Sequence, residues 1–185
     1  MALTFLALGS NLGDRRAHLY TAAQALHEHP HVHVAQASPV YESAAHTLDS
    51  SGEQPAFLNA VVQANTSLSP NALLQAAQQM ERDAGRVDDR ERWAPRPLDV
   101  DLLTYGRLVR TSETLTLPHP RLAERRFVLR PWADVAPNLW VPAPFEQTVE
   151  TLLSRCPDTA ALRKTSWRLP QAASHPPSPH DDAPF

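Results

Sequence analysis

Two aspartates one residue apart, Asp99 and Asp101, are the residues of this sequence that most clearly suggest metal chemistry. They alternate with the apolar residues Leu98, Val100 and Leu102, a pattern typical of a strand, in which alternate side chains share a face. The two carboxylates therefore point the same way, with their Cβ atoms roughly 6–7 Å apart, and they repel each other unless a cation lies between them. Oxygen ligands beside a nucleotide indicate Mg²⁺, and two such ions could bridge both carboxylates and a triphosphate. A solvated polar strand face is the simpler alternative.

An arginine-rich segment, Glu91 to Pro97, immediately precedes this pair. Arg92 and Arg96 can pair with phosphates, and the two prolines of the segment stiffen its backbone, which lowers the entropic cost of ordering it around a ligand. Trp93 could stack on a nucleotide base or fill the core, and taken alone it is better interpreted as a core residue. The segment favours a polyphosphate site next to the aspartates.

His119 lies between two prolines in the sequence Pro118 to Arg121. Its imidazole could donate to a phosphate oxygen or act as an acid or base, although a histidine in this setting is more often structural. Farther back, Phe57 and Asn59 are two residues apart on a predicted strand, so their side chains face the same side. An aromatic ring and an amide together could hold a flat, hydrogen-bonding heterocycle, and an ordinary edge pair is the alternative.

The elements that must position these residues follow from hydrophobic periodicity. The order of the predicted elements is β-α-β-β-α-β, the ferredoxin-like pattern of the α+β class. It gives an antiparallel sheet with helices on one face and leaves the other face for loops and ligands. We predict a return strand near 108–109, helical turns near 121–124, 128–135 and 148–155, and long loops over 42–55 and 86–97. The predicted strands span residues 4–8, 32–41, 57–66 and 98–105, and the two main helices begin at Asp14 and at Ser69-Pro70.

Composition limits the class of protein. The chain has 185 residues, 42% of them apolar, which fits one domain with its own core. We expect that domain to span residues 1–168 and the Pro-, Ser-, His- and Asp-rich residues 169–185 to form a disordered tail. The formal charge of −3 argues against a nucleic-acid partner, and the chain has no apolar run long enough to cross a membrane. Because Cys156 is the only cysteine, we expect a cytoplasmic protein.

Taken together, these segments resemble the 6-hydroxymethyl-7,8-dihydropterin pyrophosphokinase family over about residues 3 to 140. The match includes Leu8 to Gly13, Phe57 to Ala60 and the long motif from Glu91 to Asp101, and it continues through Leu117 to Arg121 and Arg125 to Leu129. The resemblance implies transfer of the β,γ-diphosphate of ATP to the hydroxymethyl group of the reduced pterin, with AMP as the other product, in tetrahydrofolate biosynthesis. It implies small-molecule substrates, and we expect a monomer.

The resemblance also assigns roles to residues. Asp99 and Asp101 would hold two Mg²⁺ ions, and Arg96 and His119 would steady the phosphates as charge shifts. Glu81 would be a supporting polar residue. The residues implied along ATP are Gln78, Arg92, Trp93, Arg96, Leu102, Thr116, His119 and Arg125. Those implied around the pterin are Ser43, Phe57, Asn59 and Phe127, with the pterin ring stacked between the two phenylalanines.

Several residues depart from the family pattern. Ala44-Ala45-His46 stand where the family often has Pro-Pro-Leu-Gly, and Asp88, Ala94 and Thr114 replace residues common in other members. These changes bear on ATP affinity and on closure of the two loops. Two other functions stay open from the residues themselves: a ferredoxin-like binding module, and a phospho- or nucleotidyltransferase that uses the same paired aspartates but forms a different nucleotide product.

Overall fold

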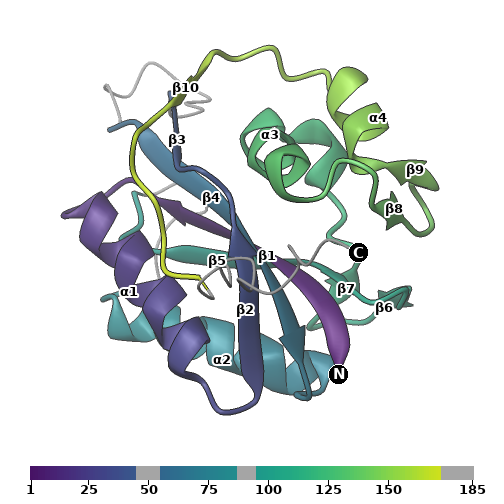
Figure 1. The fold of residues 1–185 in the computed structure, drawn as a ribbon, viewed down its shortest axis with the longest axis horizontal. Helices are drawn as coiled ribbons and strands as arrows, with labels where there is room; N and C mark the ends of the chain where they lie inside the picture. Colours follow the sequence, from purple (N-terminus) through teal and green to yellow (C-terminus); the bar gives the residue numbers. More distant parts are fainter. Residues whose placement is uncertain (45–54, 87–94, 172–185) are drawn as a thin grey trace, which may run out of the picture.

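The structure is a computed structural model that describes residues 1–44, 55–86 and 95–171 (Figure 1). Five strands follow one another in the sheet in the order β10-β3-β4-β1-β5, and β2 pairs with the other end of β4. The main elements are β1 (Ala2–Ser10), α1 (Arg15–Glu28), β2 (Val32–Ala37), β3 (Tyr41–Ser43), β4 (Phe57–Thr66), α2 (Pro70–Asp83) and β5 (Asp99–Tyr105). After β5 come β6 (Arg110–Thr111), β7 (Thr116–Leu117), η1 (Leu122–Glu124), α3 (Arg126–Val135), β8 (Trp140–Val141), β9 (Gln147–Thr148), α4 (Val149–Ser154) and β10 (Leu162–Lys164).

The predicted ferredoxin-like α+β core is confirmed, and both of its main helices begin where the sequence places them. The Asp14 carboxylate accepts a hydrogen bond from the Ala17 N–H at 3.0 Å, and the Ser69 hydroxyl accepts one from the Ala72 N–H at 3.2 Å. Such caps satisfy donors that the first helical turn leaves unpaired. In α2, however, the fully buried stripe is completed by Glu81, a residue type that sequence periodicity places at the surface.

The predicted strand 32–41 is two strands in the structure, because the chain breaks at Ser38-Pro39. Ser38 exchanges backbone and side-chain hydrogen bonds with Val61, at 2.9 Å each, and Pro39 has no N–H with which to continue the ladder. The break lets β2 and β3 pair with different halves of β4. The predicted return strand near 108–109 is also displaced: a turn closed by the Leu108 N–H on the Tyr105 carbonyl delays pairing until β6.

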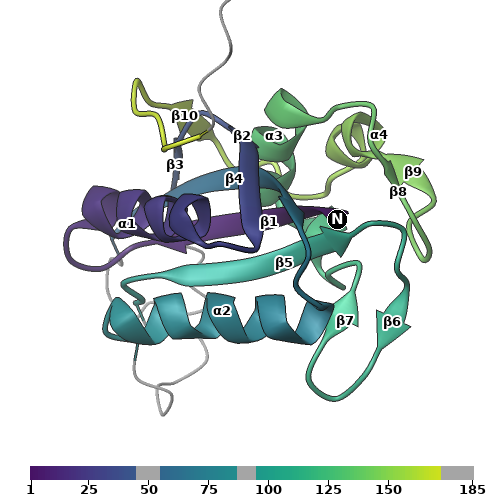
Figure 2. The same ribbon diagram turned by 60° about the horizontal axis from the view of Figure 1, so that its bottom comes forward.

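Helices cover both faces of the sheet, which corrects the prediction that they lie on one face (Figures 1 and 2). Alternation in β1 explains this arrangement. Leu6 and Leu8 point into the core shared with α1 and α2, whereas Phe5 and Ala7 point into a second core with α3 and α4. The largest side chain of the second core, Trp132, is completely buried, and its ring centroid lies 5.5 Å from that of Phe5.

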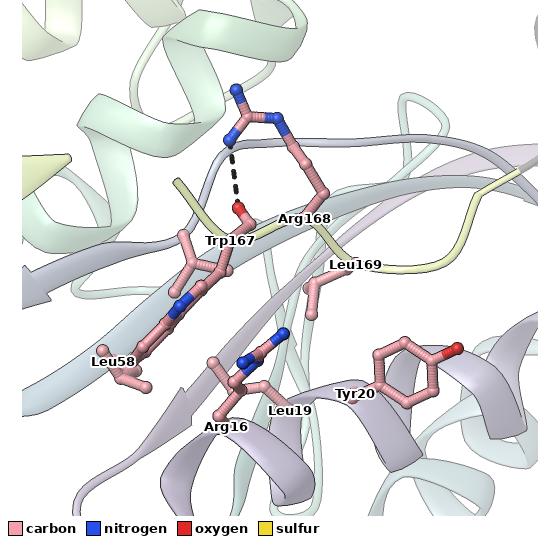
Figure 3. Close-up of a pocket in the computed structure, with 8 residues that line it drawn as sticks. Arg16, Leu19, Tyr20, Leu58, Trp167, Arg168 and Leu169 are labelled. Carbon is pink, nitrogen blue, oxygen red and sulfur yellow. Dashed lines mark hydrogen bonds between the residues drawn. The ribbon is translucent and has the colours of Figure 1, made fainter. Parts of the chain in front are cut away.

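The C-terminal segment completes the sheet. Strand β10 pairs antiparallel with β3, and the chain then runs back over α1, where the Arg16 guanidinium lies 5.3 Å from the centre of the Trp167 ring. Figure 3 shows these side chains around a small pocket together with Leu58 and Leu169. Leu169 is buried and the Gln171 side chain accepts a hydrogen bond from the Ala37 N–H, so the packed chain continues past the predicted boundary at 168. Residues 172–185 of the predicted tail lie outside the described residues.

Within residues 1–44, 55–86 and 95–171, no helix has both the length and the apolar character that a membrane span requires.

Candidate active site

Three central strands bring the predicted site residues together in register. On β1, Gly9 lies opposite Asn59 of β4 and Asp99 of β5, and Ala7 lies opposite Asp101. A side chain at Gly9 would place its Cβ 3.6 Å from the Asn59 Oδ1 and 3.9 Å from the Asp99 Cβ. Glycine therefore leaves open the space between the amide of one strand and the carboxylate of the other.

The paired aspartates share one face of β5, as the sequence predicts. Leu98, Val100 and Leu102 are buried on the other face, and the side chains of Asp99 and Asp101 keep 30% and 31% of their surface exposed. This exposure makes both carboxylates accessible to a ligand while the strand that carries them is fixed by the core.

Basic side chains surround both carboxylates. The Asp99 Oδ1 accepts hydrogen bonds from Arg86 at 2.8 Å and from Arg96 at 3.3 Å. The Asp101 Oδ2 accepts one from Arg125 at 2.9 Å. Two acidic groups beside three guanidinium groups form a site in which cations and phosphate oxygens can replace the internal partners.

Buried Asn11 fixes the backbone of Arg96. Its N–H donates to the Arg96 carbonyl at 3.1 Å, and its side-chain Oδ1 accepts from the Arg96 N–H at 2.7 Å. Two bonds in opposite directions hold this backbone against the turn that follows β1. Asn11 lies within the segment Leu8 to Gly13 that resembles the family, but the sequence alone assigned it no role.

Glu81 supports the aspartates from behind. Its Oε1 accepts from the N–H of Val100, the residue between them, at 2.8 Å, and lies 2.5 Å from the Arg86 guanidinium. Burial, with repulsion from Asp99 as a smaller cause, raises the pKa of Glu81 to about 7. Glu81 thus links α2 to β5 at the carboxylate pair.

Arg86 was missed as a site residue because a run of mixed charge is typical of a solvated loop.

His119 faces Asp101 with its Nε2 at 3.8 Å. The backbone N–H of His119 donates to the Leu103 carbonyl, and its Nδ1 accepts from the Arg121 N–H at 3.2 Å. A ring that accepts at Nδ1 carries its proton on Nε2 when neutral. Burial lowers the pKa of His119 and outweighs the opposing effect of Asp101. At neutral pH the group is therefore an uncharged donor directed at the carboxylate site.

The four residues assigned to the pterin come from two parts of the fold, which we name the amide wall (Ser43, Phe57 and Asn59, where β3 ends and β4 begins) and the aromatic wall (Phe127, at the start of α3). Asn59 is buried and donates from Nδ2 to the Ser43 hydroxyl at 3.0 Å, while Phe57 pairs in register with Ser43 at the sheet end. Phe127 lies in the first turn of α3, and the Arg125 guanidinium lies 5.9 Å from the centre of its ring. Arg125 contacts both Asp101 and Phe127 and so joins the carboxylate cluster to this second wall.

The other residues assigned to ATP lie on other elements, on the opposite face of β5 or outside the described residues. Gln78 is exposed on α2 and Thr116 is half-buried in β7. The Leu102 side chain is buried in the core beneath α2, on the face of β5 opposite the aspartates, so its contact with ATP stays a prediction. Arg92 and Trp93 lie outside the described residues, as do the inner parts of the two loops predicted to close.

Comparison with known proteins is consistent with this geometry. The sequence model of the family described as 7,8-dihydro-6-hydroxymethylpterin-pyrophosphokinase matches residues 5–137. The 2-amino-4-hydroxy-6-hydroxymethyldihydropteridine pyrophosphokinase of Bacillus subtilis is 42% identical over 135 residues, which cover 72% of this chain and 77% of that protein. The protein of the same name from Pseudomonas aeruginosa is 39% identical over 155 residues, with 83% and 91% covered.

Solved structures share the fold. A Plasmodium falciparum HPPK-DHPS structure with pteroate aligns with a TM-score of 0.63 over 83% of this chain, at 14% identity. The chain spans 42% of the length of that protein. At this identity the likeness concerns the fold alone.

Proposed function

This chain belongs to the 7,8-dihydro-6-hydroxymethylpterin-pyrophosphokinase family, and on that premise we propose that Asp99 and Asp101 lie at the centre of its active site. The enzyme transfers pyrophosphate from ATP to hydroxymethyldihydropterin in folate biosynthesis. One observation carries the assignment of the site: two carboxylates on one strand face, each held by arginine, lie beside the buried amide of Asn59 across the open position at Gly9.

The carboxylate pair fits Mg²⁺. In nucleotide sites this ion is bound through one or two carboxylates together with phosphate oxygens, and Asp99 and Asp101 supply those carboxylates. Burial is the main cause of the raised pKa of Glu81, and repulsion from Asp99 and Asp101 adds to it, so the two aspartates act as negative charges on their surroundings. Asp99 and Asp101 would hold two ions, and when bound they would neutralise phosphate oxygens during transfer.

Arginines and His119 position the phosphates. Arg86, Arg96 and Arg125 bind the aspartates, and each can transfer its donors to phosphate oxygens when a cation takes over the carboxylates. The neutral His119 offers an Nε2–H to the same oxygens. The pterin lies between Phe57 and Phe127, with its ring edge toward Asn59 and Ser43.

The reaction then needs little covalent help from the protein. A bond forms between the pterin hydroxymethyl oxygen and the β-phosphorus of ATP, the bond from that phosphorus to the α-phosphate oxygen breaks, and AMP leaves. Such transfers depend on positioning and charge neutralisation. The residues of this site supply both functions, because the core holds β5 rigidly and the arginines meet the shifting charge.

A product assay tests the proposal. The protein is mixed with Mg-ATP and hydroxymethyl-dihydropterin, and the nucleotides are followed by ³¹P NMR. We expect AMP and a pterin diphosphate in equal amounts, with turnover lowered about 10³-fold or more in Asp99→Asn and in Asp101→Asn, because each loses a charge that the transferring group requires. ADP as product would instead indicate single phosphoryl transfer, and near-normal turnover of either variant would remove the metal assignment. The cytoplasmic location and the monomeric state stay predictions.

A further inference from the structure

A polar cluster around the buried Tyr41 lies outside the residues assigned to catalysis. The Tyr41 hydroxyl donates to the Asp134 Oδ2 at 2.5 Å and accepts from the Arg130 Nε at 3.3 Å. Arg130 also forms an ion pair with the Asp134 Oδ1. We name Tyr41, Arg130 and Asp134 the tyrosine clamp. Lys164 of β10 lies at its rim, 3.7 Å from Asp134.

The clamp joins the two elements that carry the walls of the pterin pocket. On α3, Arg130 and Asp134 are three and seven residues after Phe127, so all three share one helix face. On β3, Tyr41 precedes Ser43 by two residues and lies directly opposite Asn59 in the ladder. The clamp therefore lies next to Asn59 of the amide wall on the neighbouring strand, and one to two helical turns away from Phe127, the aromatic wall.

Burial makes the contact specific. Tyr41 is 4% exposed, and a hydroxyl in such a position needs a fixed partner because an unpaired one is costly. Burial, and then the hydrogen bond to Asp134, raise the pKa of Tyr41, so its hydroxyl stays protonated and keeps donating. Because the phenol is rigid, the bond sets the distance between β3 and α3.

We propose that the tyrosine clamp is a positioning device for the pterin: it fixes the spacing between Phe127 and the wall formed by Ser43, Phe57 and Asn59, without touching the substrate. The inference rests on the proposed pterin site. Small misplacements of binding groups are expensive in enzymes, so loosening the clamp weakens pterin binding while the phosphate half, held by β5 and Asn11, keeps its affinity for ATP.

Removal of a single hydroxyl tests the proposal. Pterin affinity is measured by fluorescence titration with saturating Mg²⁺ and α,β-methylene ATP, which cannot react, and nucleotide affinity is measured separately. We expect Tyr41→Phe to weaken pterin binding about tenfold, on the scale of a misplaced binding group, and to change nucleotide binding less than twofold. The exposed Tyr20 of α1 gives the matched control, Tyr20→Phe, which should change neither affinity.

Three further variants separate the possible outcomes. Asp134→Ala removes the acceptor of the Tyr41 hydroxyl and should reproduce the loss, and the double variant Tyr41→Phe/Asp134→Ala should lose no more than either alone, because partners in one network are not additive. A lowered melting temperature with unchanged pterin affinity would mean that the clamp is only structural, and would overturn the proposal. Phe57→Ala tests the site itself: if that variant binds pterin normally, the pocket assignment fails and the clamp proposal fails with it.

Discussion

At the scale of single residues, the site combines carboxylates that repel each other with arginines that form ion pairs with them. Arg86 and Arg125 lie within 3 Å of Asp99 and Asp101, at 2.8 and 2.9 Å. Glu81 adds a third carboxyl behind the pair, and its pKa of about 7 places it between charged and neutral near physiological pH. The arginines thus hold three acidic groups close together at one end of the sheet.

Asn11 gives the sharpest test of how Arg96 is held at this site. Asn11→Ala removes the acceptor of the Arg96 N–H, and we expect about a tenfold lower kcat/KM for ATP, together with a loss of stability of about 1–3 kcal/mol, the usual effect of leaving a buried donor unpaired. Steady-state kinetics with varied ATP and urea unfolding measure the two effects. Asn71→Ala is the control, because the Asn71 side chain also accepts from an arginine, Arg110, but at the exposed surface. Equal kinetics for the two variants would show that Arg96 needs no such support.

Sequence reasoning identified some of these residues and missed others for a physical reason. Asp99 and Asp101 could be predicted from neighbouring residues, because the alternation of side chains along one strand places both carboxylates on the same face. The partner of Asn11 is 85 residues away along the chain, and no local pattern reports it. Tyr41 and Asp134 are separated by 93 residues and became a pair only once β3 and α3 were placed side by side.

At the scale of elements, a single carboxylate holds three segments together. Glu42 of β3 pairs with Arg163 of β10 and, at 3.2 Å, with Arg15 at the start of α1. The Arg163 hydrogen bond is the largest of the causes that lower the pKa of Glu42 below its ordinary value of 4.5. A lowered pKa means that the stabilisation is present above pH 4.5 and is lost as the pH falls through the folded-state value.

The lowered pKa of Glu42 predicts that its contribution to the free energy of unfolding depends on pH. Glu42→Gln should lower the free energy of unfolding by about 1 kcal/mol at pH 7, the upper range for partly exposed ion pairs. The difference should be smaller near pH 3, because protonation of the native glutamate increases as the pH falls toward its lowered pKa. Urea unfolding at the two pH values measures it. An equal difference at both would show that Glu42 acts through packing and not through its charge.

The ends of helices and strands were predictable where a cap or a turn specifies them. They were not predictable where contacts with distant parts of the chain determine them. The starts of α1 and α2 are specified by Asp14 and Ser69. The burial of Glu81 was not predictable, because its reason is the Val100 N–H on another element. The same holds for the break at Pro39, which makes sense only once Ser38 is seen to bond with Val61.

At the scale of the whole molecule, the sheet separates two hydrophobic cores, one on the face behind the aspartates and one on the face that carries them. The core with α1 and α2 supports the rear of β5, and the core with α3 and α4 lies on the face that carries the aspartates. The family match ends at residue 137, yet β10 and Leu169 beyond it extend the sheet and its core. The sequence indicated the first core from helical periodicity. The second core escaped prediction because its helices are short and because they pack on the opposite face of β1, which carries Phe5 and Ala7.

Counting bound Mn²⁺ by electron paramagnetic resonance, with Mn²⁺ in place of Mg²⁺, tests most directly whether the paired carboxylates gather cations beneath a polyphosphate. The protein is saturated with α,β-methylene ATP. We expect two ions per native chain and a loss of bound Mn²⁺ in Asp99→Asn and in Asp101→Asn, since each carboxylate is one of the ligands. Unchanged stoichiometry and affinity in both variants would contradict the account, because the cations would then be held elsewhere.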